Sequence, residues 1–247
     1  MCGENHALAL DTTGRIWGWG IGEQNELGRR FFGRHRETLV PQLVRVCRSP
    51  VKYIASGEHH SFAIDSKDNV WAWGLNSYGE AGYAKTAGGD SALLPYPMKV
   101  SELCGEGVTV LNGGSHHSAA VTNDGRCFMW GRMDGGQLGI GFTPQQLEDT
   151  ALIRHDEYGK PRICLRPTPV PGLSGSTVNV GCGTDHTIFI TRDGKGYATG
   201  FGSQGQLGLG SEDDQTVAQE MMGKGIKDKV LTWAAAGGQF SVIAAAT

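Results

Sequence analysis

The sequence predicts an all-β protein, and specifically part of a β-propeller that fills residues 1–247 as a single domain. Three observations lead to this fold class. Four segments repeat with the same internal spacing, and glycine is abundant, at 39 of 247 residues against roughly 17 at average usage. No stretch shows a sustained helical period with caps. A β unit of this size cannot bury both faces alone, so neighbouring units must stack on one another.

Each repeat core begins with a glycine that is followed three residues later by histidine. A second glycine comes 17 residues after the first, and a third comes eight residues further on. The four cores are residues 3–28, 57–82, 114–139 and 183–208. A fifth copy opens at Gly237-Gly238, and we assign it as a half repeat, 238–247, with Ser241 in the place of the histidine and Phe240 before it.

Within each core the pattern indicates a β-hairpin. A short β-compatible run follows the histidine, at 7–10, 61–64, 118–121 and 187–190. A polar turn such as Thr122-Asn-Asp-Gly125 comes next, and the second run ends at the second glycine, in three copies as aromatic-x-Trp-Gly. Turn residues of this kind between two apolar runs are typical of hairpins.

The connectors between cores should supply the remaining strands. The runs 51–54, 108–111, 177–180 and 230–233 each fit a strand just before a core. The longest connector contains 145–171, which is rich in charge and proline and predicts a surface excursion. The only short helical candidates are 148–153 and 218–222.

Composition and motifs argue against several functional classes. The chain has 22 Lys+Arg and 25 Asp+Glu, a net charge of −3, so bulk charge does not indicate a nucleic-acid binder. No apolar run approaches a membrane span. The six cysteines form no C-x-x-C pair and are expected as isolated thiols. Hydrolase, metalloprotease and P-loop motifs are missing. We therefore predict no enzyme, no catalytic residues, no cofactor and no metal.

The histidine of each core is expected to be a buried, hydrogen-bonding structural residue. In His59-His60 and His116-His117, adjacent side chains on a strand point to opposite faces, so neither pair can chelate one ion. The residue before the repeated histidine varies but is mostly polar. This column reads Asn5, His59, His116, Asp185 and Phe240. It falls at a strand start on the propeller rim, where variable polar groups suit partner recognition. Plain solvent exposure is the alternative for any one of them.

The pattern Gly-x-x-His, Asp-Gly, Trp-Gly and Gly-Gln-Leu-Gly resembles the repeat of the regulator of chromosome condensation family. Three segments carry the resemblance to the members that act as nuclear exchange factors for the small GTPase Ran. These segments are 22–29, 114–117 and 220–224. The family fold is a closed seven-bladed propeller, so the resemblance implies that this chain holds the C-terminal four repeats and a stub. An incomplete chain, half of a split protein and a four-bladed ring remain alternatives.

The resemblance also implies a binding site for the GTPase. His116 and Arg29 fall on positions that the family uses to engage it, and Asn5 stands where the family usually has Asp. His59 and Asp185 join them by their place in the column. The expected mechanism is preferential binding of the nucleotide-free GTPase on one propeller face, with no covalent chemistry.

The resemblance further implies nuclear localisation and association with chromatin, through histones and DNA, and it gives no membrane partner. Two rival hypotheses remain. One is a non-catalytic interaction scaffold with the same propeller, such as a signalling or ubiquitin-pathway adaptor. The other is a fragment without activity of its own.

The segment 29–36 contains four arginines and two phenylalanines. Such a loop could bind phosphate or acidic surfaces. The simpler interpretation is a solvated loop whose phenylalanines pin it to the blade. The acidic run 212–214 reads as a solvated turn.

Overall fold

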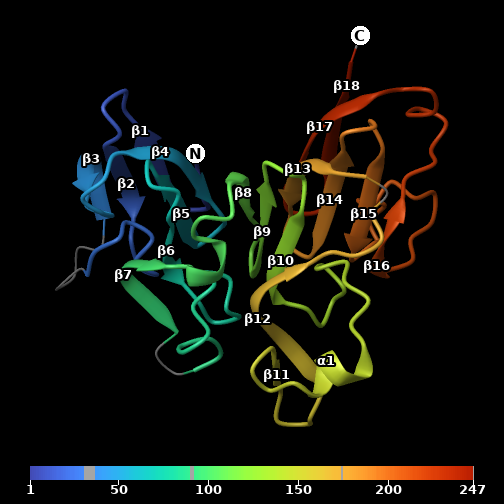
Figure 1. Ribbon diagram of the computed structural model, residues 1–247, viewed down its shortest axis with the longest axis horizontal. Helices are drawn as coiled ribbons and strands as arrows, with labels where there is room; N and C mark the ends of the chain where they lie inside the picture. Colours follow the sequence, from blue (N-terminus) through green and yellow to red (C-terminus); the bar gives the residue numbers. More distant parts are fainter. Residues whose placement is uncertain (31–36, 90–91, 174, 247) are drawn as a thin grey trace.

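The computed structural model describes residues 1–30, 37–89, 92–173 and 175–246, which form five antiparallel sheets. Figure 1 shows that the sheets follow one another in chain order, from blue to red, as the blades of a partial β-propeller. The all-β prediction is confirmed, because among the described residues helix is limited to the 3₁₀ turn η1 (Ser101–Leu103) and the single-turn helix α1 (Pro144–Glu148).

Hydrogen-bonded neighbours within each sheet are as follows. The first sheet is β1 (His6–Leu10), β2 (Ile16–Ile21) and β3 (Glu37–Val44). The second is β4 (Val51–Ser56), β5 (His60–Asp65), β6 (Val70–Leu75) and β7 (Leu93–Lys99). The third is β8 (Val108–Gly113), β9 (His117–Thr122), β10 (Cys127–Arg132), β12 (Pro161–Pro169) and β11 (Ile153–His155). The fourth is β13 (Thr177–Cys182), β14 (His186–Thr191), β15 (Gly196–Gly200) and β16 (Gln215–Glu220), and the fifth is β17 (Leu231–Ala236) and β18 (Ser241–Ala245).

The strands expected just before each core are confirmed as β4, β8, β13 and β17. These strands contact one another in turn, so they form the inner edge of the stacked sheets. In the first sheet an isolated bridge between Cys2 and Ala7 takes the place of an inner strand.

One of the two helical expectations is wrong, and the other is displaced. Residues 218–222 overlap β16, whose pairing with β15 overrides the local helical propensity. The helix expected at 148–153 lies earlier, in α1, because Thr143 and Gln146 form a capping box and proline occupies the first helical turn. Ile153 instead begins β11.

The core lies between neighbouring sheets. The tryptophan before the second glycine is fully buried at Trp73 and Trp130. Each indole also reaches back to the preceding sheet. Trp73 Nε1 donates to the carbonyl of Glu26 at 2.6 Å, and Trp130 Nε1 donates to that of Glu80 at 2.9 Å. This contact explains why aromatic-x-Trp-Gly recurs.

The repeated histidines form a ladder across the sheets, as expected for structural residues. His60 is fully buried, and its Nε2 lies 2.8 Å from Ser118 Oγ of the next sheet. Ser118 in turn donates to the carbonyl of Glu80. Since the hydroxyl is already donating, it accepts the Nε2 hydrogen of His60. The other three rungs are His6 with Ser61, His117 with Thr187, and His186 with Ser241.

The ladder corrects the alignment of the fifth copy by one residue. Ser241 accepts from His186 as Ser118 accepts from His60, so Ser241 stands one place after the histidine position. Phe240 itself occupies that position, and the amide of Gly237 donates to its carbonyl as Gly57 donates to His60. The half repeat thus begins at 237, not at 238, and Gln239 replaces Phe240 in the preceding column. The two adjacent glycines made both alignments compatible with the sequence.

Two further observations limit what the fold can carry. No helix in the described ranges has the length and apolar character needed to cross a membrane. Nowhere in residues 1–30, 37–89, 92–173 or 175–246 do three or more metal-ligating side chains converge.

Candidate functional site

The site is a row of five residues, each directly before a histidine strand or its equivalent. We call Asn5, His59, His116, Asp185 and Gln239 the rim row. Asn5 and Gln239 are exposed, and the other three are half-buried. Side-chain contacts described below link one sheet to the next along this row, so it follows a single edge of the stacked sheets.

A backbone contact fixes four of the five rim residues at the start of their strands. The carbonyl of His116 accepts from the amide of Arg132 at 2.8 Å, and that of His59 accepts from the amide of Leu75 at 2.9 Å. The second glycine of the repeat lies in the adjacent strand, directly before the donating amide. Gly131 has φ +102, and a Cβ there would lie 2.6 Å from the His116 carbonyl oxygen. Glycine is required because of both the backbone angle and this close approach.

Gly131→Ala is therefore expected to lower the free energy of unfolding by about 2–3 kcal/mol, because it adds backbone strain and a steric clash. Urea denaturation measures the loss. The matched control is Gly141→Ala, where a Cβ would meet only Val217 Cγ2, at 3.5 Å, without a positive φ. Equal effects of the two substitutions would contradict the role given to Gly131.

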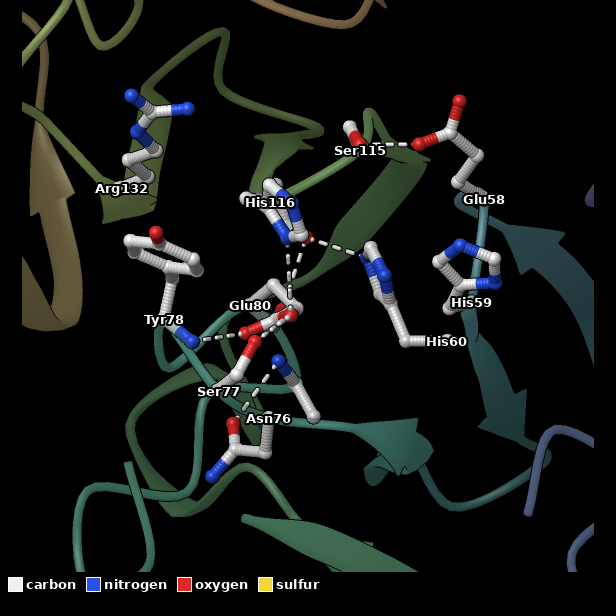
Figure 2. Close-up of polar contacts among 12 residues, drawn as sticks. Glu58, His59, His60, Asn76, Ser77, Tyr78, Glu80, Ser115, His116 and Arg132 are labelled. Atoms are coloured by element: carbon white, nitrogen blue, oxygen red, sulfur yellow. Dashed lines mark hydrogen bonds and ion pairs between the residues drawn. The ribbon is translucent and has the colours of Figure 1, made fainter. Parts of the chain in front are cut away.

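His116 lies between an aromatic ring and a buried carboxylate (Figure 2). Its ring centroid is 4.6 Å from that of Tyr78, and its Nδ1 is 3.5 Å from Glu80 Oε1. The side chain of Glu80 is 0% exposed, and that of His116 is 27% exposed. Arg132 and Arg162 both lie over the ring of Tyr78.

His59 is enclosed by two carboxylates. Its Nε2 lies 3.0 Å from Glu4, and its Nδ1 lies 3.7 Å from the buried Glu26. Contact with Glu26 is the main cause that raises the pKa of His59, with Glu4 adding to it. His59 is thus stabilised in its charged form more than an isolated imidazole is.

Asp185 pairs with an arginine, unlike His59 and His116, which face carboxylates. Asp185 accepts from Arg132 Nη1 at 3.3 Å, across the junction of the third and fourth sheets.

Arg29 lies by the first sheet, where it donates to Thr38 Oγ1 at 2.6 Å. Thr38 pairs with Gly20, and Gly20 pairs with His6, so Arg29 reaches the end of the first sheet at which Asn5 lies. Of the arginine-rich segment, residues 31–36 lie outside the described residues.

Sequence reasoning missed the residues that support the rim row. Two positions before the third glycine, every core carries a side-chain oxygen that accepts the backbone N–H of the residue two earlier. These residues are Glu26, Glu80, Gln137 and Gln206. In three cores the side chain also meets the rim residue of the next sheet: Glu26 meets His59, Glu80 meets His116 and Gln206 meets Gln239. The sequence feature that could have revealed them is the presence of glutamate at this position in the first two cores and of glutamine in the other two.

Comparisons with known proteins agree with the repeat architecture. A model of the RCC1-like domain matches residues 1–243. Protein pim1 of Schizosaccharomyces pombe is 38% identical over 98% of this chain and 44% of its own length. The Saccharomyces cerevisiae protein named guanine nucleotide exchange factor SRM1 is 33% identical over 97% of this chain and 48% of its own length.

Solved structures give the same picture. The crystal structure of Prp20p from Saccharomyces cerevisiae, described together with its binding properties to Gsp1p and histones, superposes with a TM-score of 0.90. It is 32% identical, and the match covers 99% of this chain and 55% of that one. The chain thus spans about half the length of the curated relatives it matches.

Proposed function

The chain belongs to the family of RCC1-like domains, and we propose that it acts in guanine-nucleotide exchange on the small GTPase Ran. In this proposal the rim row and Arg29 form the surface that binds the GTPase. A relative named as a guanine nucleotide exchange factor, at 33% identity, supports the activity. The match to Prp20p, which is described with binding to Gsp1p and histones, supports partners of the same two kinds.

The observation that carries the proposal is the rim row itself. Its side chains differ from sheet to sheet, while the backbone contacts that hold four of them are the same. A rigid frame that presents variable polar groups along one edge is suited to recognising a protein surface. The histidine ladder directly beneath the row keeps this frame from deforming when a partner binds.

Exchange by such a surface needs no covalent step. The protein binds nucleotide-free Ran more tightly than GDP-bound Ran, and this difference in affinity lowers the barrier to nucleotide release. Because linkage is reciprocal, nucleotide that binds again expels the exchange factor. His116, His59, Asp185, Asn5 and Arg29 act by contacting the GTPase and not by reacting with the nucleotide.

The experiment compares the affinity of the chain for nucleotide-free Ran and for Ran loaded with GDP, measured by biolayer interferometry. We expect nucleotide-free Ran to bind at least 100-fold more tightly, a coupling of about 3 kcal/mol. Equal affinities would favour the rival function of a non-catalytic scaffold. No binding to either form by a chain that melts cooperatively would reject Ran as the partner.

Association with chromatin in the nucleus is the second part of the proposal. Four arginines in 29–36 supply local positive charge on a chain of net charge −3. If this segment contacts DNA phosphates, affinity for a nucleosome must fall steeply between low and physiological salt, because bound counterions are released. Replacing Arg30, Arg34 and Arg36 with Ala should flatten that dependence. An unchanged dependence of affinity on salt would mean that the segment is a solvated loop that does not contact DNA.

A further inference from the structure

Glu80 is a buried carboxylate with few partners. Its Oε2 accepts the amide hydrogen of Tyr78 at 2.7 Å, and its Oε1 lies 3.3 Å from the hydroxyl of Ser77. The remaining neighbour is Nδ1 of His116, at 3.5 Å from Oε1 (Figure 2). A carboxylate removed from water is costly unless donors surround it. The imidazole of His116 is the titratable group that faces it.

The other repeats show what a neutral residue does at the same position. Gln206 uses its oxygen to accept the amide of Gln204, and its Nε2 donates to Gln239 Oε1 at 2.7 Å. An ionised glutamate has no hydrogen to donate, so the rim residue of the next sheet must be the donor. In this chain both glutamates are followed by a rim histidine, and both glutamines are followed by Asp185 or Gln239. Where the inner residue is glutamate, the rim residue is thus one that can donate, and where it is Gln206, the rim residue Gln239 accepts; Nε2 of Gln137 has no hydrogen-bond partner among the described residues.

His116 and His59 differ in what their outer nitrogen does. Nε2 of His59 is engaged by Glu4 at 3.0 Å. Within the described ranges, Nε2 of His116 is not paired with any hydrogen-bond or ion-pair partner. Its buried Nδ1 makes no hydrogen bond of regular geometry, and the charged group that faces it is Glu80, with Oε1 at 3.5 Å. The ring of Tyr78 packs against the imidazole at an interplanar angle of 40°. The Nδ1 side of the His116 ring thus faces the buried carboxylate of Glu80, whereas Nε2 is left without a partner from this chain.

We propose that Glu80 is a positioning residue for His116: its carboxylate keeps the hydrogen of the neutral ring on Nδ1 and leaves Nε2 to be offered to the GTPase. A carboxylate that holds one ring nitrogen fixes the tautomer of the other. In this tautomer Nε2 accepts a hydrogen bond, so the group opposite it on the partner is an N–H or O–H donor. The role toward the GTPase rests on the proposed function, whereas the tautomer does not.

The first test observes the ring directly. Long-range ¹H–¹⁵N spectra of the full chain labelled with ¹⁵N-histidine report which nitrogen of a neutral His116 carries hydrogen, and His116→Ala assigns the signals. We expect Nδ1–H in the wild type. In Glu80→Gln the glutamine amide donates to Nδ1, so the hydrogen should move to Nε2. The same tautomer in both proteins would overturn the proposal.

The second test measures affinity for nucleotide-free Ran. Glu80→Gln should weaken binding roughly ten-fold, with little change in the midpoint of unfolding. The matched control is Glu102→Gln, the same substitution at an exposed glutamate of η1 outside the rim row, which should leave affinity unchanged. Equal affinity of Glu80→Gln and the wild type would overturn the positioning role. If the wild type does not bind Ran at all, the proposed function fails, and the ring spectra still decide whether Glu80 holds His116.

A double variant provides a third test that remains usable if Glu80→Gln alone misfolds. Glu80→Gln with His116→Gln copies the pair formed by Gln206 and Gln239, so it should be more stable than the sum of the two single changes predicts. Strictly additive stabilities would show that the two positions do not interact, and this outcome would also overturn the proposal.

Discussion

Lowering the pH from 7 to 5 is expected to reduce the free energy of unfolding by about 4 kcal/mol through His6 and His117 alone. Burial lowers the pKa of His6 from its usual 6.5 to about 4 and that of His117 to about 3. Both lie in the ladder between sheets and are almost completely buried. The loss is large against the 5–15 kcal/mol that is typical of folded domains.

The sign follows from which state takes up the proton. Below pH 6.5 an unfolded histidine becomes protonated, while the buried ring stays neutral until the pH approaches its lowered pKa. Each such ring therefore lowers the free energy of unfolding by about 2 kcal/mol when the pH falls from 7 to 5. Burial also lowers the pKa of His60 and His186, so both add to the loss. His59 acts in the opposite direction, because its raised pKa stabilises the fold at low pH and that stabilisation is lost as the pH rises.

Urea denaturation at half-unit steps from pH 7.5 to 5 measures this dependence. His117→Phe, which copies Phe240 of the fifth sheet, removes one titrating ring and should reduce the loss between pH 7 and 5 by about 2 kcal/mol. Most surface carboxylates titrate below this window. An unfolding free energy that stays constant from pH 7 to 5 would show that the histidines are not buried as neutral groups.

Under the proposed function, the double variant Arg29→Ala with His116→Ala is expected to slow Ran nucleotide exchange about 100-fold, because truncating two proposed contact residues would remove about 3 kcal/mol of interaction with the nucleotide-free GTPase. Release of fluorescent GDP from Ran measures the rate. Each single variant should account for roughly ten-fold. The unfolding midpoint should change little, since His116 is partly exposed and its backbone contact does not depend on the side chain.

The matched control removes two positive charges from the opposite ends of histidine strands. Lys67 and Arg192 are exposed in the hairpin turns after β5 and β14. The variant Lys67→Ala with Arg192→Ala should exchange nucleotide as fast as the wild type. If this control is slowed as much as the Arg29 and His116 variant, general charge and not the rim row governs the interaction.

The repeat pattern was sufficient to predict the fold because each invariant residue performs a local task. The second glycine permits a close backbone approach, and the histidine hydrogen-bonds to the next sheet. The strands at 51–56, 108–113, 177–182 and 231–236 follow from alternating apolar residues at a fixed distance before each core. Spacing alone could not choose between Gly237 and Gly238, and the hydrogen bonds of Ser241 with His186 and of Gly237 with Phe240 resolve that register.

The candidate site was predicted in part. The rim column follows from the position before the histidine, but its partners lie one sheet away. Glu26 meets His59 across 33 positions of chain, and Glu80 meets His116 across 36. Contacts of this kind depend on how blades stack, which periodicity within one repeat does not describe. Aligning the four repeats shows that either Glu or Gln occupies this position. Only the structure shows that the side chain there contacts the rim residue of the next sheet.

Release of fluorescent GDP from Ran, with and without substoichiometric amounts of this chain, tests the central claim most directly. If the rim row binds the nucleotide-free GTPase in preference to the GDP-bound form, the release rate rises in proportion to the amount of chain, and each molecule of chain acts on many molecules of Ran. A folded, monodisperse chain that leaves the release rate at its spontaneous value at every concentration would contradict it.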